Sequence, residues 1–215
     1  MLLNLRLEYN TAYGEDLYVV VVAPVKKTFA MSYVGDSQWV ASIKLASAEE
    51  LTYHYEVRRG DSLVRKEWGG DHHMAIDKKA TTIRIEDRWV DMPYDRSFHS
   101  SMFTDGVFAR PKRKKAQGAM DGYLTLRADI ASVRSTQSVV LVGDSKALGQ
   151  WDVKKGVVMS DADAPVWSAR IKAPKTPFAY KFVIIDTASG DVVAWQSGDN
   201  YYFNGNVNEG EGVVV

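Results

Sequence analysis

The chain has 215 residues, with 27 Lys and Arg against 27 Asp and Glu, so its formal net charge is zero. No overall field therefore attracts nucleic acid or an anionic membrane, and we expect neither as a partner. Cysteine is absent, which excludes a disulfide scaffold and a thiolate metal site.

The first half of the chain is patterned as short strands. The opening stretch MLLNLRLEYN lacks a basic region before an apolar core, so we interpret residues 2–9 as a strand and not as part of a signal peptide. The turn-rich loop NTAYGED separates it from an apolar run at 17–23. Residues 40–45 and 81–90 alternate apolar and polar side chains, and residues 51–69 follow the pattern of a hairpin. No apolar run reaches the roughly 18 residues of a membrane span. This spacing of strands and turns predicts a β-sandwich or a barrel.

Residues 91–121 break this pattern. The segment is poor in β-branched residues and ends in a charged, glycine-containing stretch, which predicts a linker between two domains. Its basic cluster at 110–115 is interpreted as solvated linker and not as a nucleic-acid site, because the rest of the chain supplies no further basic surface. Its apolar residues are expected to pack on one of the domains or on a neighbouring protein: Phe98, Met102, Phe103, Val107 and Phe108.

The strand pattern resumes at Tyr123 and repeats features of the first half. Each half has an apolar strand, a Trp that begins a strand, an aromatic-rich strand and a later strand with a Trp near its end. We therefore predict an all-β chain of two immunoglobulin-like antiparallel β-sandwich modules in tandem. The first, diverged module is expected at 1–90, the linker at 91–121 and the second module at 122–215.

Aromatic residues stand at strand ends in the second half. Trp151 follows a glycine-containing loop, and Trp195 closes a strand directly before the turn residues 196–200. Lys181 interrupts an apolar strand between two aromatic residues. Two indoles, a long cation and an amide on loops at one end of a sheet suit a sugar, because a pyranose ring presents an apolar C–H face and a rim of hydroxyls.

The motifs LGQWD, VW, FAYKF and VVAWQSGDN, in this order and at these intervals, resemble the starch-binding module of carbohydrate-binding family 20. The resemblance implies that Trp151 and Trp195 form a platform for neighbouring glucose rings of an α-1,4 chain. It also implies that Lys181 and Asn200 bond to sugar hydroxyls. Gln196 stands where the family has Glu, and its amide can still donate and accept. The alternative is that Trp195 packs in the core and Lys181 is merely an exposed strand residue.

The family usually has a second glucan site. The first half of this sequence matches the motif of that site better than the second half does. The loop AYGEDLY is similar to the family's loop, so the resemblance implies that Tyr13 stacks on a sugar, with Trp39 beside it and Tyr33 as a third aromatic candidate. In the second half the matching loop tyrosines are missing, and Trp167 is expected to cover the core. The counterpart of the Trp151 and Trp195 site is expected to be lost from the first half, where His54 replaces the family Lys and Trp68 is a remnant.

Catalytic signatures are missing from the sequence. There is no GxSxG, HExxH or P-loop motif, and His72 and His73 are adjacent, so on a strand they point to opposite faces and cannot share a metal. A carboxylate pair for glycoside cleavage stays an open alternative, although family 20 modules are not themselves catalytic. We expect no catalytic residue, metal or cofactor in this chain.

Tandem family 20 modules with a diverged first member resemble the N-terminal region of disproportionating 4-α-glucanotransferases, the amylomaltases of glycoside hydrolase family 77. The stretch DRWVDMPYDRSFHSSMFTDGVF is similar to the segment between their modules. The resemblance implies a cytoplasmic region that binds starch, glycogen or maltodextrin for a family 77 domain of the same polypeptide, within maltose metabolism. Two alternatives remain: a β-sandwich module for protein interaction or oligomerisation without sugar binding, and a glycogen-sensing domain of a kinase-like assembly.

Overall fold

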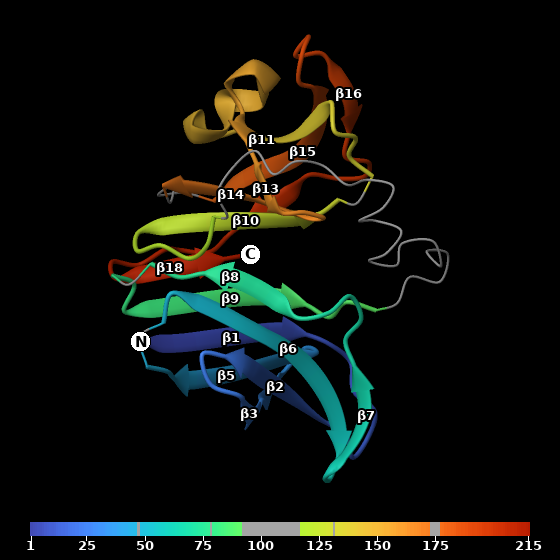
Figure 1. The fold of residues 1–215 in the computed structure, drawn as a ribbon, viewed down its shortest axis with the longest axis vertical. Helices are drawn as coiled ribbons and strands as arrows, with labels where there is room; N and C mark the ends of the chain where they lie inside the picture. The colour runs from blue at the N-terminus through green and yellow to red at the C-terminus, as the bar shows by residue number, and fades with distance from the viewer. Residues whose placement is uncertain (47, 78, 92–116, 131, 173–176) are drawn as a thin grey trace. The chain divides into compact units, whose positions relative to one another are not determined.

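The computed structural model describes residues 1–215 except 47, 78, 92–116, 131 and 173–176 (Figure 1). The described residues form two compact units. The first contains 1–91, 118–122 and 209–215, and the second contains 117 and 123–208, with the gaps just given. Strands make up most of both units, so the predicted all-β class is confirmed. The predicted linker falls largely at 92–116, outside the described residues.

Two sheets build the first unit. The first sheet has the order β18-β9-β1-β5-β4, and the second has the order β3-β2-β6-β7 with β8 also paired to β6. The strands of the first sheet are β1 (Leu2–Glu8), β4 (Ser32–Gly35), β5 (Gln38–Lys44), β9 (Thr82–Arg88) and β18 (Glu211–Val214). Those of the second are β2 (Asp16–Ala23), β3 (Lys27–Ala30), β6 (Glu50–Arg59), β7 (Ser62–Lys66) and β8 (His72–Ala75).

Alternating side chains from the two sheets form the core of the first unit. Leu3, Leu5 and Leu7 on β1 are buried, and burial of each such side chain contributes about 1.5–3 kcal/mol. Tyr53 and Tyr55 are also fully buried, and their hydroxyls donate to Asp87 Oδ2 at 2.7 and 2.9 Å. Burial, with the Asp87 carboxylate beside it, raises the pKa of Tyr55 well above its ordinary value. The hydroxyl therefore stays protonated and able to donate.

The C-terminal strand belongs to the first unit, whereas the sequence analysis placed it in the second module. β18 runs parallel to β9, with Val213 opposite Arg84, and Val214 joins the core of the first unit. Residues 118–122 also lie in this unit, where Ala119 bridges to Ile76. The apolar end of the chain is buried against β9, a long-range pairing that local sequence pattern does not reveal.

The strands of the second unit pair in two sets. One has the order β13-β14-β10, and the other has the order β12-β11-β15-β16, with β17 also paired to β15. The strands of the former are β10 (Tyr123–Asp129), β13 (Ser160–Asp163) and β14 (Val166–Lys172). The strands of the latter are β11 (Gln137–Gly143), β12 (Val157–Val158), β15 (Phe178–Asp186), β16 (Val192–Trp195) and β17 (Tyr201–Phe203). Two short 3₁₀-helices, η1 (Lys146–Trp151) and η2 (Val153–Lys155), follow β11.

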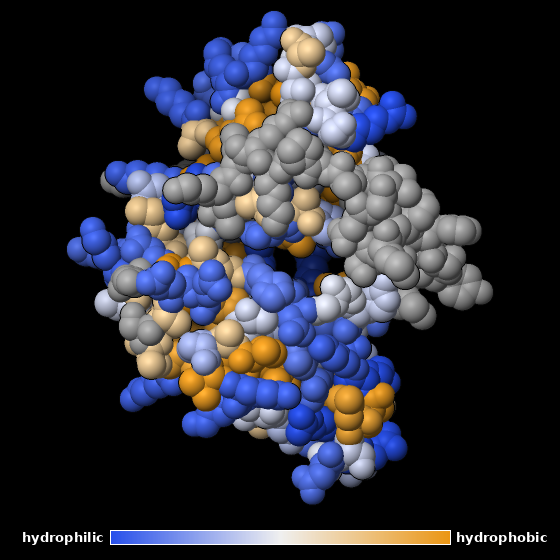
Figure 2. Space-filling view, viewed as in Figure 1, coloured by the Kyte–Doolittle hydropathy of each residue, from blue (hydrophilic) through white to orange (hydrophobic). Residues whose placement is uncertain are grey.

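The visible surface is mainly hydrophilic, with separate apolar patches (Figure 2). One patch lies over β7, where Leu63 and Val64 are exposed. Among the described residues, no helix has the length and apolar character needed to cross a bilayer.

Candidate functional site

Trp195 and Lys181 lie on the same face of the β11–β15–β16 sheet. Lys181 on β15 lies opposite Val142 on β11, and Val183 on β15 lies opposite Trp195 on β16. Because residues two apart on a strand share a face, Lys181, Val183 and Trp195 point to one side. On this side Val142 and Val183 pack with Val153 of η2. The segment that carries Trp151 therefore covers the face that presents Trp195.

Trp151 sits at the end of η1 in an unusual backbone conformation. Gly149, Gln150 and Trp151 have φ angles of 77, 51 and 67°. Such values cost non-glycine residues about 1–2 kcal/mol each, and they occur at sites where the surrounding structure imposes them. Gly149 has no alternative, since a Cβ there would come within 2.7 Å of the Lys155 carbonyl carbon. The tight turn holds Trp151 with 36% of its surface exposed.

The turn after Trp195 is tied to β15 by side chains. Lys181 Nζ donates to Gly198 O at 2.7 Å and to Gln196 O at 3.4 Å. The Gln196 amide oxygen accepts from Phe182 N at 3.3 Å, and Gln196 N donates to Phe182 O at 2.9 Å. Lys181 and Gln196 therefore position the turn. An ammonium has three N–H donors, so Lys181 retains one that has no acceptor among the described residues.

Lys181 and Trp195, both predicted from the sequence, thus lie on one face of the sheet. Trp195 is 46% exposed, so the alternative in which it packs in the core is wrong. Asn200 is half-buried at the end of the turn that Lys181 holds. Trp167, in contrast, is buried and donates its indole N–H to Ile130 O at 3.2 Å. The structure therefore presents Trp151 and Trp195 to solvent and keeps Trp167 in the core.

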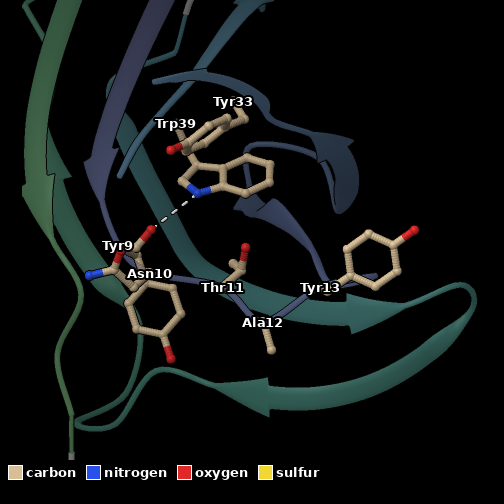
Figure 3. A pocket seen from close by; sticks show the side chains of 7 residues that line it. All are labelled: Tyr9, Asn10, Thr11, Ala12, Tyr13, Tyr33 and Trp39. Carbon is tan, nitrogen blue, oxygen red and sulfur yellow. Dashed lines mark hydrogen bonds between the residues drawn. The ribbon is translucent and has the colours of Figure 1, made fainter. Parts of the chain in front are cut away.

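A pocket of about 310 Å³ opens on the first unit (Figure 3). It brings together the three aromatic residues expected from the sequence, Tyr13, Tyr33 and Trp39. Trp39 is mostly buried and donates its indole N–H to Tyr9 O at 3.2 Å, and its ring lies 5.3 Å from the Tyr33 ring. Tyr13 is fully exposed and points away from the protein surface. A ligand in this pocket would meet the Trp39 ring, which is held in place, and the Tyr13 ring, which is free to move.

Sequence reasoning missed two residues that build this pocket. Tyr9 lines it and stacks on Trp89 at 4.3 Å. Its place at the end of the first strand, directly before the loop, was an available signal. Glu15 fixes the loop: its buried carboxylate accepts from Ala12 N at 3.0 Å, lies 3.4 Å from Arg59 and pairs with Arg65. The bond from Ala12 and the two guanidinium charges lower the pKa of Glu15 despite the opposing effect of burial.

His54 does not replace the family lysine as a free donor. It is buried, with Nε2 3.2 Å from Glu56 and Nδ1 2.9 Å from Asp71. Within the described part of the chain, no group of three or more His, Asp and Glu side chains could hold a metal ion. His72 Nε2 lies 3.0 Å from Glu67 Oε1, whereas His73 Nδ1 lies 3.1 Å from Thr52 Oγ1, so the two adjacent histidines have different partners.

A family model described as the starch-binding domain matches residues 124–211. The segment that holds Trp151, Lys181 and Trp195 is therefore similar to starch-binding domains. The match ends inside β18, so it contains almost the whole second unit and none of the pocket around Tyr13.

The chain is also similar to parts of several starch-related proteins. A cyclomaltodextrin glucanotransferase from Klebsiella oxytoca is 38% identical over 139 residues, which cover 64% of this chain and 19% of that protein. The family 20 carbohydrate-binding module of a maltotetraose-forming amylase from Pseudomonas saccharophila is 25% identical, covering 43% of this chain and 97% of its own, with a TM-score of 0.38. A gamma-CGTase from alkalophilic Bacillus clarkii is 17% identical, covering 92% of this chain and 22% of its own, with a TM-score of 0.37. This chain therefore spans only about a fifth of the length of the curated relative.

Proposed function

We propose that this chain is a non-catalytic region that binds α-1,4-glucan, with its principal site on the starch-binding domain of the second unit. The observation that carries the proposal is the exposure of Trp151 and Trp195 on one side of the β11–β15–β16 sheet. An exposed indole offers a flat apolar face on which a ligand can stack. The C–H face of a glucose ring is a matching surface.

Each polar residue of the site has a distinct role in this proposal. Lys181 directs its remaining N–H donor to a sugar hydroxyl, and Asn200 offers an amide that donates and accepts. Gln196 acts through its bonds to Phe182, which hold Trp195 and the following turn in place. Because Lys181 and Gln196 already hold the turn after Trp195 in the free protein, less binding energy is lost to ordering that turn.

The pocket of the first unit is a second glucan site in this proposal. Tyr13 stacks on a sugar ring while Trp39 and Tyr33 form the wall of the pocket. A single stacking contact with a flexible glucan is weak. Two sites on one chain raise the local concentration of polymer, so long glucans are held more tightly than maltose.

The attached activity is also a proposal. The Klebsiella relative is a glucanotransferase, which supports a parent protein that transfers glucosyl units between α-glucans. The sequence resemblance favours a family 77 amylomaltase in the cytoplasm, and the name of the relative favours a cyclodextrin-forming enzyme. Incubation of the full-length protein with maltoheptaose distinguishes them: an amylomaltase yields a ladder of linear products, whereas the other enzyme yields cyclodextrins.

Titration with β-cyclodextrin, followed by Trp fluorescence, tests the glucan site. We expect saturable binding by the wild type and its loss in the double variant Trp151→Ala/Trp195→Ala, with residual binding assigned to the pocket of the first unit. Leu63→Ala is the control, because it removes an exposed apolar side chain of the first unit outside both proposed sites. Circular dichroism shows whether each variant is folded. A folded wild type that binds no cyclodextrin contradicts the proposal and favours a protein-interaction or oligomerisation module.

A further inference from the structure

A third exposed aromatic residue lies on the sheet face that presents Trp195. β11 pairs along one edge of β15. β17 and β16 pair with the first and second halves of β15, so both lie at its other edge. Tyr202 is opposite Ala179, and Trp195 is opposite Val183. Ala179, Lys181 and Val183 alternate along β15 and therefore share a face. Tyr202, Lys181 and Trp195 consequently follow one another on one side of the sheet.

The two adjacent tyrosines of β17 have different surroundings. The Tyr201 ring lies 5.5 Å from Tyr180 and 5.9 Å from Phe182, so it packs against the sheet. Tyr202 is 65% exposed and makes no ring contact within the described part of the chain. An isolated exposed tyrosine is ordinary. One aligned with an exposed tryptophan, with a cation between them, provides a second ring surface for the same ligand.

The spacing along the strand sets what such a ligand must be. The partners of Trp195 and Tyr202 are four residues apart on β15, which corresponds to about 13 Å. At this backbone spacing the two aromatic side chains offer two successive stacking positions along the strand. A ligand that uses both is an extended chain of rings lying along the strand direction, with hydroxyls beside the Lys181 ammonium.

We propose that Tyr202 is a specificity-determining residue that extends the glucan site of the second unit past Trp195, so that the site selects longer linear α-glucans over maltose. The inference rests on the proposed function of this unit. The face of β15 between the two aromatic residues carries Lys181, which supplies the polar contact along the extended site. The turn at 196–200 bends back to this lysine, so it is held close to β15.

Calorimetric titration of Tyr202→Ala with maltose and with maltoheptaose tests the inference. We expect the Kd for maltoheptaose to rise about five- to tenfold, the loss of one stacking contact, while the Kd for maltose changes by less than about twofold. Tyr202→Phe keeps the ring and should bind both sugars as the wild type does. Leu63→Ala is the control for removal of an exposed apolar side chain.

Each other outcome overturns the inference in a recognisable way. Unchanged binding of maltoheptaose by Tyr202→Ala shows that this ring contacts no sugar. An equal loss for both sugars shows that Tyr202 supports the platform at Trp195 and does not extend it. If the folded wild type binds neither sugar, the proposed function of the unit fails together with the extension.

Discussion

At the scale of single residues, Glu15 fixes the loop that carries Tyr13. It is a buried carboxylate that accepts from Ala12 N and faces Arg59 and Arg65. Tyr13 itself is fully exposed, so the position of its ring depends on the loop backbone and not on packing. A ligand in the pocket of the first unit therefore depends on Glu15 without touching it.

The charge of Glu15 predicts a pH dependence. Its folded-state pKa lies below its ordinary value of 4.5, so its contribution to stability is fully present above the unfolded pKa and is lost as the pH falls through the folded pKa. We expect Glu15→Gln to lower the free energy of unfolding near neutral pH, and the difference from wild type to shrink in acid. Urea unfolding across this pH range measures it. Glu8→Gln, an exposed residue of β1, is the control and should show no such trend. A difference between Glu15→Gln and wild type that stays constant with pH would contradict the assignment.

Lys181 and Gln196 show what sequence reasoning can recover about a site and what it cannot. The pattern of aromatic, cationic and amide residues singled out Lys181 and Trp195, which the structure brings to one face of the sheet, because these residue types are set by local motifs. Hydrogen-bond partners depend on the exact course of the backbone, so the bonds of Lys181 to the turn and of Gln196 to Phe182 were not predicted. Glu15 was missed for the same reason, since its arginine partners lie 44 and 50 positions away in the sequence.

At the scale of elements, the 3₁₀-helix η1 depends on Gly149 for its shape. The strand runs at 17–23 and 40–45 were predictable because alternating or continuous apolar side chains mark strands, and they overlap β2 and β5. The 3₁₀ segment was not predicted. Its shape comes from consecutive positive φ angles and from contact with η2, neither of which leaves a periodic pattern.

Gly149→Ala should destabilise η1 more than Gly190→Ala destabilises the turn that contains Gly190. A Cβ at this position would meet the Lys155–Gly156 backbone at 2.7–2.9 Å, so both conformational strain and overlap oppose it. Gly190 has almost the same φ, 76°, but open space around it, and Gly190→Ala should cost only about 1 kcal/mol. We expect Gly149→Ala to destabilise the protein by about 2 kcal/mol or more and to weaken β-cyclodextrin binding through Trp151. Thermal unfolding and titration of both variants measure the effect, and equal losses for the two would show that the overlap has no consequence.

At the scale of the whole molecule, the all-β class was predictable from the sequence, but the unit to which the last strand belongs was not. The last strand, with the buried residues Val213 and Val214, completes the sheet of the first unit beside β9. Strand pairing between positions so far apart in sequence is set by which edge offers apolar partners after folding. The pattern of either segment alone contains no such information.

Deletion of residues 209–215 should therefore damage the first unit. It removes two fully buried valines, each contributing about 1.5–3 kcal/mol, and exposes one edge of β9. We expect faster hydrogen exchange in β9 and β1, with β11 and β15 of the second unit less affected. Removal of Val215 alone, which is half-buried and outside β18, is the control. Uniform loss of protection in both units would contradict the assignment of this strand.

The return of the chain to the first unit also brings the two ends of the intervening segment, residues 123–208, close together. Gly122 N donates to Glu211 O at 2.9 Å, so the backbone leaves for residues 123–208 and comes back at neighbouring points. A segment whose two ends are adjacent is a favourable place to exchange one sequence for another with adjacent ends, or for a short turn. Joining Gly122 to Glu209 through a glycine-rich turn would give the first unit by itself with its C-terminal strand in place. The same junction would accept a binding domain with a different sugar preference.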